Sequence, residues 1–460
     1  MLHNKVKMFL LIISFMLNGL SVAQFNKVYR ISHAEDYQPA EVTIAINPKS
    51  PQNLVAAFIT MQKKFPYIES NTYISQDAGK TWLKIATNNP ENRIQGDDGV
   101  TFSSEGTVYH SYLSFFDLSK SDSKERPSSG IYVSSSTDGG LSWYQRSFVV
   151  DHLNTSAPME DKPYVATDNA PNSSYKNNVY LAWTHFEKYE SKNPADSSQI
   201  YFSKSIDSGK TFSPYLRIST YGGDCLDGDN TVEGAITAVG PKGEVYVVWG
   251  GPRGLEFTKS LDGGKTFSKS EVIGYIHNGW DFDIKGISRS NGMPVTKVDL
   301  SKGKYNGSIY VNWIDDRNGD PDVFLKYSRD RGKTWSNPVR VNDDSVGNGK
   351  DQFFTWMSVD PIDGSVNCVF YDRRDLDSTK TGVTLARSVD GGKTFKNYKI
   401  NIKPFECNSK VFFGDYTGID AYDGEVVPIF MHFVSKDNLA VSAAIFQFEP
   451  ETLKEKKTNN

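Results

Sequence analysis

The residues of this chain that could do acid–base chemistry are histidines and tyrosines, most of them in segments without a regular strand pattern. Six of the seven histidines lie beyond residue 23, and they are His33, His110, His152, His185, His277 and His432. An imidazole titrates near neutrality, so it can take or give a proton at physiological pH. Tyr189 follows His185 in the stretch His-Phe-Glu-Lys-Tyr. The candidate catalytic residues are therefore His185, Tyr189, His110 and His277.

Cationic and aromatic side chains in the same kinds of segment could bind a negatively charged ligand. Guanidinium and ammonium groups hold carboxylate or sulfate oxygens, as a two-pronged fork or as a point charge. The candidate substrate-binding residues are Arg253, Arg289, Lys63, Trp280 and His152. The competing interpretation is that they are ordinary solvated loop residues.

An acidic stretch offers one candidate for a structural cation. Asp224, Asp227 and Asp229 are spaced so that their oxygens could gather around a hard ion such as Ca²⁺, although the stretch is not an EF-hand loop. A solvated acidic turn is the alternative.

The elements that must position these residues are marked by a repeated pattern, Ser-x-Asp-x-Gly-x-x-aromatic. It occurs six times, starting at Ser75, Ser136, Ser205, Ser260, Ser328 and Ser388. The Asp carboxylate can accept backbone N–H bonds within a turn, Gly tolerates positive φ, and the aromatic ring packs between sheets. Each copy therefore predicts a tight hairpin turn and not a functional site.

Strand-like runs around each turn predict the fold. Two runs precede the turn, as at 236–239 and 245–249, and two more strands flank it, which makes the four-stranded blade of a β-propeller. Units begin near Val42, Gly99, Tyr164, Ala235, Val295, Trp356 and Ile419. We predict an all-β propeller of seven four-stranded blades, six of them with the turn. If the ring closes by strand exchange, residues 27–31 complete the last blade.

The repeated pattern resembles the Asp boxes, or BNR repeats, of sialidase-like β-propellers. The resemblance implies that these turns share one rim and that ligands bind at the opposite face. That face consists of the loops leaving the second strand of each blade and of the crossings to the next blade. It would carry eight of the nine candidate residues, whereas His110 falls inside a second strand.

A sialidase is the first activity that this resemblance implies. The segment Tyr29-Arg30-Ile31-Ser32 is similar to the Arg-Ile-Pro segment of sialidases, with Ser32 in place of the proline. However, residues 56–62 contain no second arginine, and residues 63–71 contain no aspartate that could be the acid. Seven blades also differ from the six of sialidases. Sialidase activity is therefore the alternative and not the leading hypothesis.

The leading hypothesis is β-elimination from a uronic-acid glycan. The chain resembles the seven-bladed ulvan lyases and related oligosaccharide dehydratases of marine bacteria, although no lyase motif aligns with its candidate residues. This reaction needs a group that neutralises the carboxylate, a His or Tyr base for the C5 proton, and an acid for the oxygen leaving C4. It requires no metal or other cofactor in principle. A third hypothesis is a non-catalytic glycan-binding propeller, which needs no acid–base pair.

Composition and the chain ends suggest partners and location. Lys plus Arg total 51 against 55 Asp plus Glu, so the basic surface that nucleic acid requires is not expected. Lys5 and Lys7 precede an apolar run and a small-residue site at 21–23, which predicts a signal peptide at 1–23. We expect a periplasmic or secreted monomer without a membrane anchor, with one propeller domain at 24–448, a polar tail at 449–460 and an anionic oligo- or polysaccharide as ligand. Three cysteines, at 225, 368 and 407, allow at most one disulfide.

Overall fold

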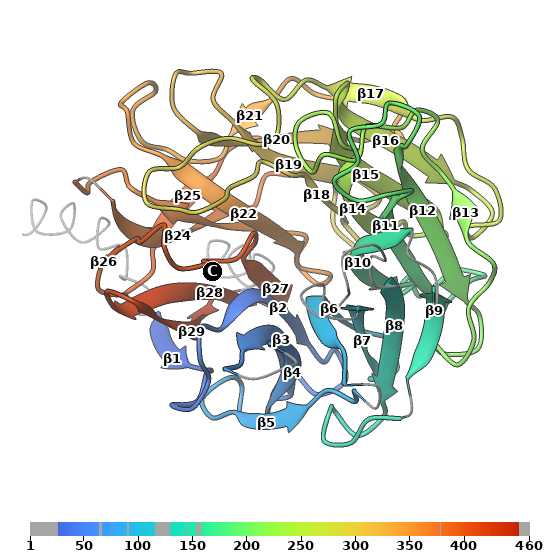
Figure 1. Cartoon of the computed structure of the whole chain (residues 1–460), viewed down its shortest axis with the longest axis horizontal. Helices are drawn as coiled ribbons and strands as arrows, with labels where there is room; N and C mark the ends of the chain where they lie inside the picture. Colours follow the sequence, from blue (N-terminus) through green and yellow to red (C-terminus); the bar gives the residue numbers. More distant parts are fainter. Residues whose placement is uncertain are drawn as a thin grey trace, which may run out of the picture.

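The computed structural model describes residues 26–63, 67–89, 92–115, 129–144, 146–152, 158–377 and 379–449. The regular secondary structure of these described residues consists of β-strands, which form seven sheets around one axis (Figure 1). The all-β, seven-bladed prediction is confirmed. The predicted signal peptide and residues 450–460 of the predicted tail lie outside the described residues. The described part of the chain has no helix long and apolar enough to span a membrane.

The first six blades each consist of four consecutive antiparallel strands, ordered from the axis outward. Blade 1 contains β2 (Ala40–Ile46), β3 (Leu54–Met61), β4 (Ile68–Ser75) and β5 (Leu83–Ala86). Blade 2 contains β6 (Ile94–Phe102), β7 (Val108–Phe115), β8 (Ser129–Ser136) and β9 (Ser147–Asp151). Blade 3 contains β10 (Met159–Thr167), β11 (Val179–Phe186), β12 (Ser198–Ser205) and β13 (Leu216–Arg217).

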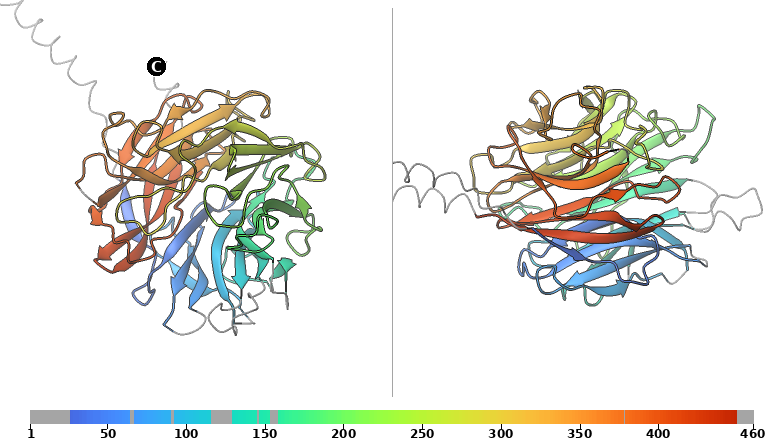
Figure 2. Two further views of the ribbon diagram at one scale, coloured as in Figure 1. Left: turned by 45° about the horizontal axis from the view of Figure 1, so that its top comes forward. Right: turned by 90° about the vertical axis from the view of Figure 1, so that its left-hand side faces the viewer.

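The next three blades repeat this order. Blade 4 contains β14 (Glu233–Val239), β15 (Val245–Gly251), β16 (Gly254–Ser260) and β17 (Glu271–Gly274). Blade 5 contains β18 (Val295–Val298), β19 (Ile309–Asp315), β20 (Asp322–Ser328) and β21 (Val339–Arg340). Blade 6 contains β22 (Gln352–Val359), β23 (Val366–Asp372), β24 (Lys380–Ser388) and β25 (Lys396–Lys399), and the short β26 (Phe405–Glu406) also pairs with β24. Figure 2 shows the blades twisted and stacked one behind the next around the ring.

The ring closes by strand exchange, as the sequence predicts. Blade 7 contains β27 (Gly418–Tyr422), β28 (Glu425–Ser435) and β29 (Asn438–Gln447), and its outermost strand is β1 (Lys27–Arg30). Lys27 is opposite Ile445 and Arg30 is opposite Ser442 in this antiparallel pair. The beginning and the end of the described chain are therefore joined in one sheet, in which β1 pairs with the edge of β29 that would otherwise be open.

The second strand of each blade carries most of the core. β11, β15 and β19 are buried along their whole length, and each has a tryptophan at its fifth position that is fully buried. These strands are covered on both faces because each blade packs against two neighbours. Their nearly continuous apolar sequence follows from this two-sided burial. Three free cysteines, all buried, lie in the described residues, and none is in a disulfide.

The six Asp boxes form six equivalent turns between the third and fourth strands. In the first box, Ser75 Oγ donates to Asp77 Oδ1, and the same oxygen accepts the backbone N–H groups of Lys80 and Thr81. These hydrogen bonds outweigh the effect of burial and lower the pKa of Asp77. The prediction that each box is a structural turn is confirmed. In an antiparallel blade, the third strand ends at the rim opposite to the start of the first, so all boxes share one rim.

The box glycine has a second role that the sequence does not show, because it lies against the preceding blade. A Cβ built on Gly332 would be 2.5 Å from the ring of Phe257 in blade 4, and one on Gly264 would be 2.8 Å from Phe202 in blade 3. The corresponding contacts of Gly79, Gly140, Gly209 and Gly392 also fall on the preceding blade. The Asp box therefore sets the spacing between blades as well as the turn.

Replacing a box glycine should destabilise the propeller more than positive φ alone explains. Gly332 (φ +72) and Gly319 (φ +95) share the left-handed backbone, but nothing lies within 4 Å of a Cβ at Gly319. We expect Gly332→Ala to lower the free energy of unfolding by about 1–3 kcal/mol more than Gly319→Ala, because only the former overpacks an interface. Urea unfolding of both variants would measure the difference. Equal losses would show that Phe257 moves aside freely.

Candidate functional site

Six of the seven innermost strands begin earlier than the sequence pattern predicts, and in blades 1–4 the additional residues include charged ones. The predicted unit starts at Gly99, Tyr164 and Ala235 correspond to strands that begin at Ile94, Met159 and Glu233. In five blades the pairing register shifts at this point, and the residue at the shift has positive φ: Glu41, Asp97, Lys162, Gly234 and Phe354. A bulge of this kind redirects side chains and is common beside functional sites. Here it gathers charged residues at the rim opposite the Asp boxes.

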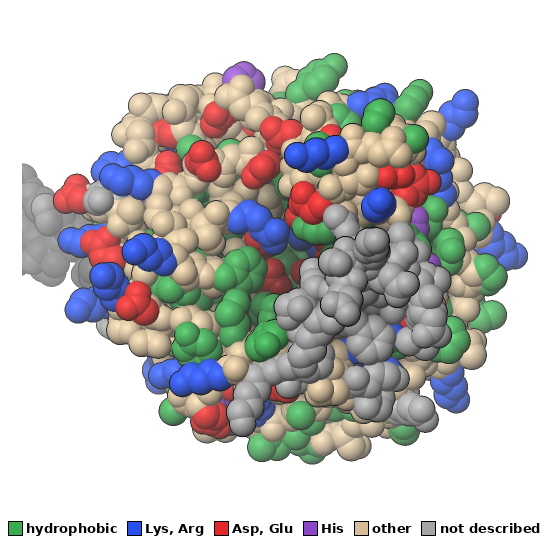
Figure 3. All heavy atoms as spheres, in the orientation of Figure 1, with side chains coloured by type: hydrophobic (Ala, Val, Ile, Leu, Met, Phe, Trp, Pro, Cys, Tyr) green, Lys and Arg blue, Asp and Glu red, His purple; other side chains and the backbone are tan. Residues whose placement is uncertain are grey.

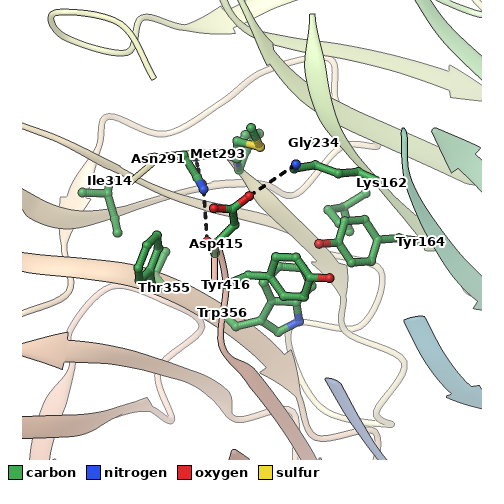
Figure 4. A pocket seen from close by; sticks show the side chains of 13 residues that line it. Lys162, Tyr164, Gly234, Asn291, Met293, Ile314, Thr355, Trp356, Asp415 and Tyr416 are labelled. Carbon is green, nitrogen blue, oxygen red and sulfur yellow. Dashed lines mark hydrogen bonds and ion pairs between the residues drawn. The ribbon is translucent and has the colours of Figure 1, made fainter. Parts of the chain in front are cut away.

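A small hollow, partly open to solvent, lies at the axis beside these residues (Figure 4). One wall is aromatic: the ring centres of Tyr164, Trp356 and Tyr416 lie 5.2–5.7 Å apart. The other side is polar, with Lys162 and Asn291 pointing toward Asp415 (Figure 4). The hollow therefore combines a surface for an apolar ring face with hydrogen-bonding groups.

Lys162 is the centre of the charged network. Its ammonium lies 3.0 Å from Glu233 of blade 4 and 3.5 Å from Asp415, which precedes blade 7, and all three side chains are almost completely buried. Burial alone would lower the pKa of Lys162, but Glu233, Asp161, Asp97 and Asp415 raise it well above its ordinary value. The lysine is therefore charged and links three blades across the axis.

Burial opposes the ionisation of several carboxyl groups around Lys162. Burial raises the pKa of Glu233 to about 8, and Lys162 offsets only part of that increase. Burial, followed by repulsion from Asp97 and Asp415, likewise raises the pKa of Glu41. The pKa of Asp161 is raised mainly by burial. The axial site is consequently less negative than its number of carboxyl groups suggests.

A second chain of contacts extends from the network toward solvent. Arg289 donates through Nε and Nη2 to the two carboxylate oxygens of Asp415, and its Nη1 lies 3.5 Å from Asp227 Oδ2. The Tyr189 hydroxyl donates to the same Asp227 oxygen at 2.6 Å. The structure thus brings together predicted catalytic Tyr189 and predicted substrate-binding Arg289, with Asp227 between them.

The protonation states in this chain differ from residue to residue. Burial and the neighbouring Asp227 raise the pKa of Tyr189, so the phenol stays protonated. Burial would raise the pKa of Asp227, but Lys162, Tyr189 and Arg289 lower it overall, so this carboxylate is ionised. Asp415 and Asp227 raise the pKa of Arg289 despite its desolvation. The site therefore combines a protonated acid (Tyr189), an ionised carboxylate (Asp227) and a fixed cation (Arg289).

Two predicted residues, His152 and His185, form a separate cluster on blade 3. His152 Nε2 lies 2.6 Å and His185 Nδ1 lies 2.9 Å from Oε1 of Glu160, and Trp183 Nε1 donates to Oε2 at 2.6 Å. The ring of Tyr201 stacks on His185 with centres 4.3 Å apart. Burial would raise the pKa of Glu160, but the two histidines lower it overall. His185 is therefore engaged here and not in the axial network.

The other predicted catalytic histidines have different surroundings. His110 is 1% exposed, and its Nε2 lies 2.5 Å from Asp98 Oδ1, which Ser70 also contacts. It is part of the packing between blades 1 and 2. His277 is exposed and contacts Asp316 at 3.1 Å.

The remaining predicted binding residues do not join the axial network either. The Trp280 ring is buried and donates to the backbone oxygen of Thr231. Arg253 stacks on the ring of Tyr221 and contacts Glu256. Lys63 is exposed in the loop after β3. Of the five predicted binding residues, Arg289 is the one that the structure connects to the axial network.

Arg30 and the three predicted cation ligands have specific contacts in the structure. Arg30, which resembles the first arginine of sialidases, ends the outermost strand of blade 7, where its side chain donates to the backbone oxygens of Ser32 and His33. The predicted cation ligands Asp224, Asp227 and Asp229 have separate partners: Thr231, Tyr189 and the backbone of Asp281. In the described residues, the three aspartates do not form a group with donor atoms close enough to hold one ion.

Glu160, Glu233 and Lys162 are not among the residues that the sequence predicts for the site, because charged residues interrupt the apolar pattern of the inner strands. One signal was available: the stretch Met-Glu-Asp-Lys-Pro immediately precedes Tyr164 at a predicted unit start. In the space-filling view, acidic and basic side chains likewise gather near the middle of this face (Figure 3).

Comparisons with known proteins confirm the predicted resemblance to Asp-box propellers. The BNR/Asp-box repeat matches residues 326–337, which contain the fifth box, Ser328 to Trp335. No curated protein matches the sequence. Similar solved structures include a Dyadobacter fermentans protein of unknown function, with a TM-score of 0.52 at 12% identity, covering 92% of this chain and 98% of that one.

Two carbohydrate-active enzymes are also among the similar structures. An ulvan lyase of polysaccharide lyase family PL25, bound to -[GlcA(1-4)Rha3S]-, has a TM-score of 0.50 at 12% identity and covers 90% of this chain and 95% of that one. The NanB sialidase of Streptococcus pneumoniae has a TM-score of 0.47 at 11% identity and covers 96% of this chain and 97% of that one. At these identities the likeness is one of fold.

The neutral Glu233 should leave a signature in the pH dependence of stability. Because its pKa is about 8 in the folded chain and near 4.5 in the unfolded chain, the folded state binds more protons between these values. Stability should therefore fall as pH rises from 4.5 to 8, with Glu233 contributing up to about 1.4 kcal/mol per pH unit. Urea unfolding should give a flatter profile for Glu233→Gln than for the wild type. The exposed Glu271→Gln is the control, and identical profiles for both variants would refute the assignment.

Proposed function

We propose that this protein is a carbohydrate-active enzyme that cleaves a uronic-acid-containing anionic glycan by β-elimination at the mouth of the axial hollow. The observation that carries the proposal is that Asp227 holds the Tyr189 phenol and the Arg289 guanidinium on one oxygen. Both groups are therefore within reach of a single sugar residue. A cation and a proton donor at one sugar are what elimination from a uronate requires.

Arg289 would bind the substrate carboxylate. Its side chain is 46% exposed, and Asp415 anchors it through Nε and Nη2, which leaves Nη1 on the side of Asp227. A guanidinium fixed in this way neutralises the carboxylate and stabilises the enolate-like intermediate that forms when C5 loses its proton. Because its orientation is already set, little reorganisation is needed when the substrate binds.

Asp227 and Tyr189 would move the protons. The ionised Asp227 takes the proton from C5, and the protonated Tyr189 gives its proton to the oxygen leaving C4. The hydrogen bond between them then returns the proton from Asp227 to Tyr189, so that both groups regain their starting states. The bond from C4 to oxygen breaks, and a C4–C5 double bond forms. His185, the predicted partner of Tyr189, is assigned no proton transfer because it contacts Glu160 instead.

The aromatic wall formed by Tyr164, Trp356 and Tyr416 would supply the stacking surface for the sugar ring. An anionic glycan is the proposed partner, and the proposed location is the periplasm or the medium, since the sequence at 1–23 predicts export.

The first test is the rise in ultraviolet absorbance of an unsaturated uronate when the purified protein is incubated with sulfated uronic-acid polysaccharides and their oligosaccharides. We expect Tyr189→Phe and Arg289→Ala to reduce the rate by about 10² or more, since each removes a group that acts in the transition state. Tyr144→Phe and Arg331→Ala are matched controls, because both residues are exposed at Asp-box turns on the opposite rim. Full activity in Tyr189→Phe would exclude the mechanism.

Glycoside hydrolysis is the second candidate, and the contrast between Glu233 and Asp227 favours it. The pKa of Glu233 is raised to about 8 while that of Asp227 is lowered. Two neighbouring carboxyl groups with opposite shifts can serve as acid and base. Release of reducing sugar or sialic acid without a rise in absorbance, and its loss in Glu233→Gln, would support hydrolysis in place of elimination.

A further inference from the structure

The cluster of His152, Glu160 and His185 on blade 3 has the composition of a metal site. Among the described residues it is a group whose Nε2, Oε and Nδ1 donor atoms all lie within 4.8 Å of one another. The three side chains come from three elements: the crossing after β9, the first residues of β10, and the end of β11. They therefore converge through the fold and not through sequence proximity.

The backbone explains why Glu160 and His185 meet. They are directly opposite each other in the antiparallel pair of β10 and β11, and side chains at such positions lie on one face of the sheet. Trp183 is two residues before His185 on β11, so it shares this face and reaches the second oxygen of Glu160.

The surroundings hold both ligands in place. The indole of Trp183 fixes Glu160 Oε2, which leaves Oε1 directed at the two imidazoles, and the ring of Tyr201 stacks on His185. Partners of this kind orient the ligands in protein metal sites and strengthen metal binding. Glu160 is 1% and His185 9% exposed, whereas His152 is 15% exposed, so the cluster is accessible from the side of His152.

We propose that His152, Glu160 and His185 bind a divalent transition-metal ion of the zinc type. Two imidazoles and one carboxylate favour such an ion over Ca²⁺ or Mg²⁺, which prefer all-oxygen ligands. A tetrahedral zinc ion with ligand bonds of about 2.0–2.2 Å separates its donor atoms by about 3.3–3.6 Å. The contacts of 2.6 and 2.9 Å between the imidazoles and Glu160 Oε1 would therefore lengthen by several tenths of an ångström when the ion binds. The ion would fasten the crossing that carries His152 to the first two strands of blade 3.

The metal site does not depend on the proposed glycan reaction, and its test needs no substrate. Full-length protein freed of metal by a chelator would be titrated with Zn²⁺ by calorimetry, and with Co²⁺ while its visible absorption is recorded. We expect about one ion per chain, a Co²⁺ spectrum of low-coordinate geometry and a rise in melting temperature with Zn²⁺. Absence of stoichiometric binding would overturn the proposal.

Variants distinguish this site from chance binding by surface histidines. His152→Ala should weaken Zn²⁺ binding at least 100-fold, because it removes one of three ligands. His277→Ala removes an exposed imidazole outside the cluster and should bind Zn²⁺ like the wild type. Glu160→Gln, which keeps the shape of the buried side chain, is the second ligand variant, and circular dichroism would verify its fold. Unchanged binding in His152→Ala and Glu160→Gln would refute the site.

Discussion

The buried charge of Lys162 is the interaction on which the axial site depends. Its ammonium contacts Glu233 and Asp415, so blades 3, 4 and 7 meet at one nitrogen atom. A buried cation without partners would be very costly, and the surrounding carboxyl groups compensate that cost. The same contacts orient Asp415, which in turn anchors Arg289. The buried ion pair of Lys162 and Asp415 thus sets the position of the Arg289 guanidinium.

The fold could be predicted from the sequence because it is repeated. Six Asp boxes mark six turns, and each second strand carries an apolar run, so the count of seven blades and the closing strand at residues 27–31 follow from local patterns. Contacts between neighbouring blades are harder to predict from the sequence. The approach of Gly332 to Phe257 joins two units, and nothing in either segment alone indicates it.

The candidate site could be predicted only in part. Tyr189 and Arg289 of the proposed site are among the residues that the sequence predicts, because their chemical types and loop positions suit proton transfer and anion binding. Glu233 and Lys162 were missed because alternation of apolar and polar residues defines a strand in sequence, and a bulge breaks that alternation. His185 and His152 are also among the predicted residues, but Glu160, which contacts both, is not, because the cross-strand pairing of Glu160 with His185 cannot be recognised from the sequence.

The bulge in β10 also explains how one strand serves two clusters. Residues two apart in a regular strand point to the same face. Without the bulge, the side chains of Glu160 and Lys162 would therefore lie side by side on one face of β10. The positive φ of Lys162 and the register shift after Asp161 turn the lysine toward the axis, while Glu160 stays on the face of His185. A left-handed conformation at a non-glycine residue costs free energy. Here that strain separates a carboxylate held by two histidines from an ammonium held by carboxyl groups, and it keeps Glu160 from pairing with Lys162.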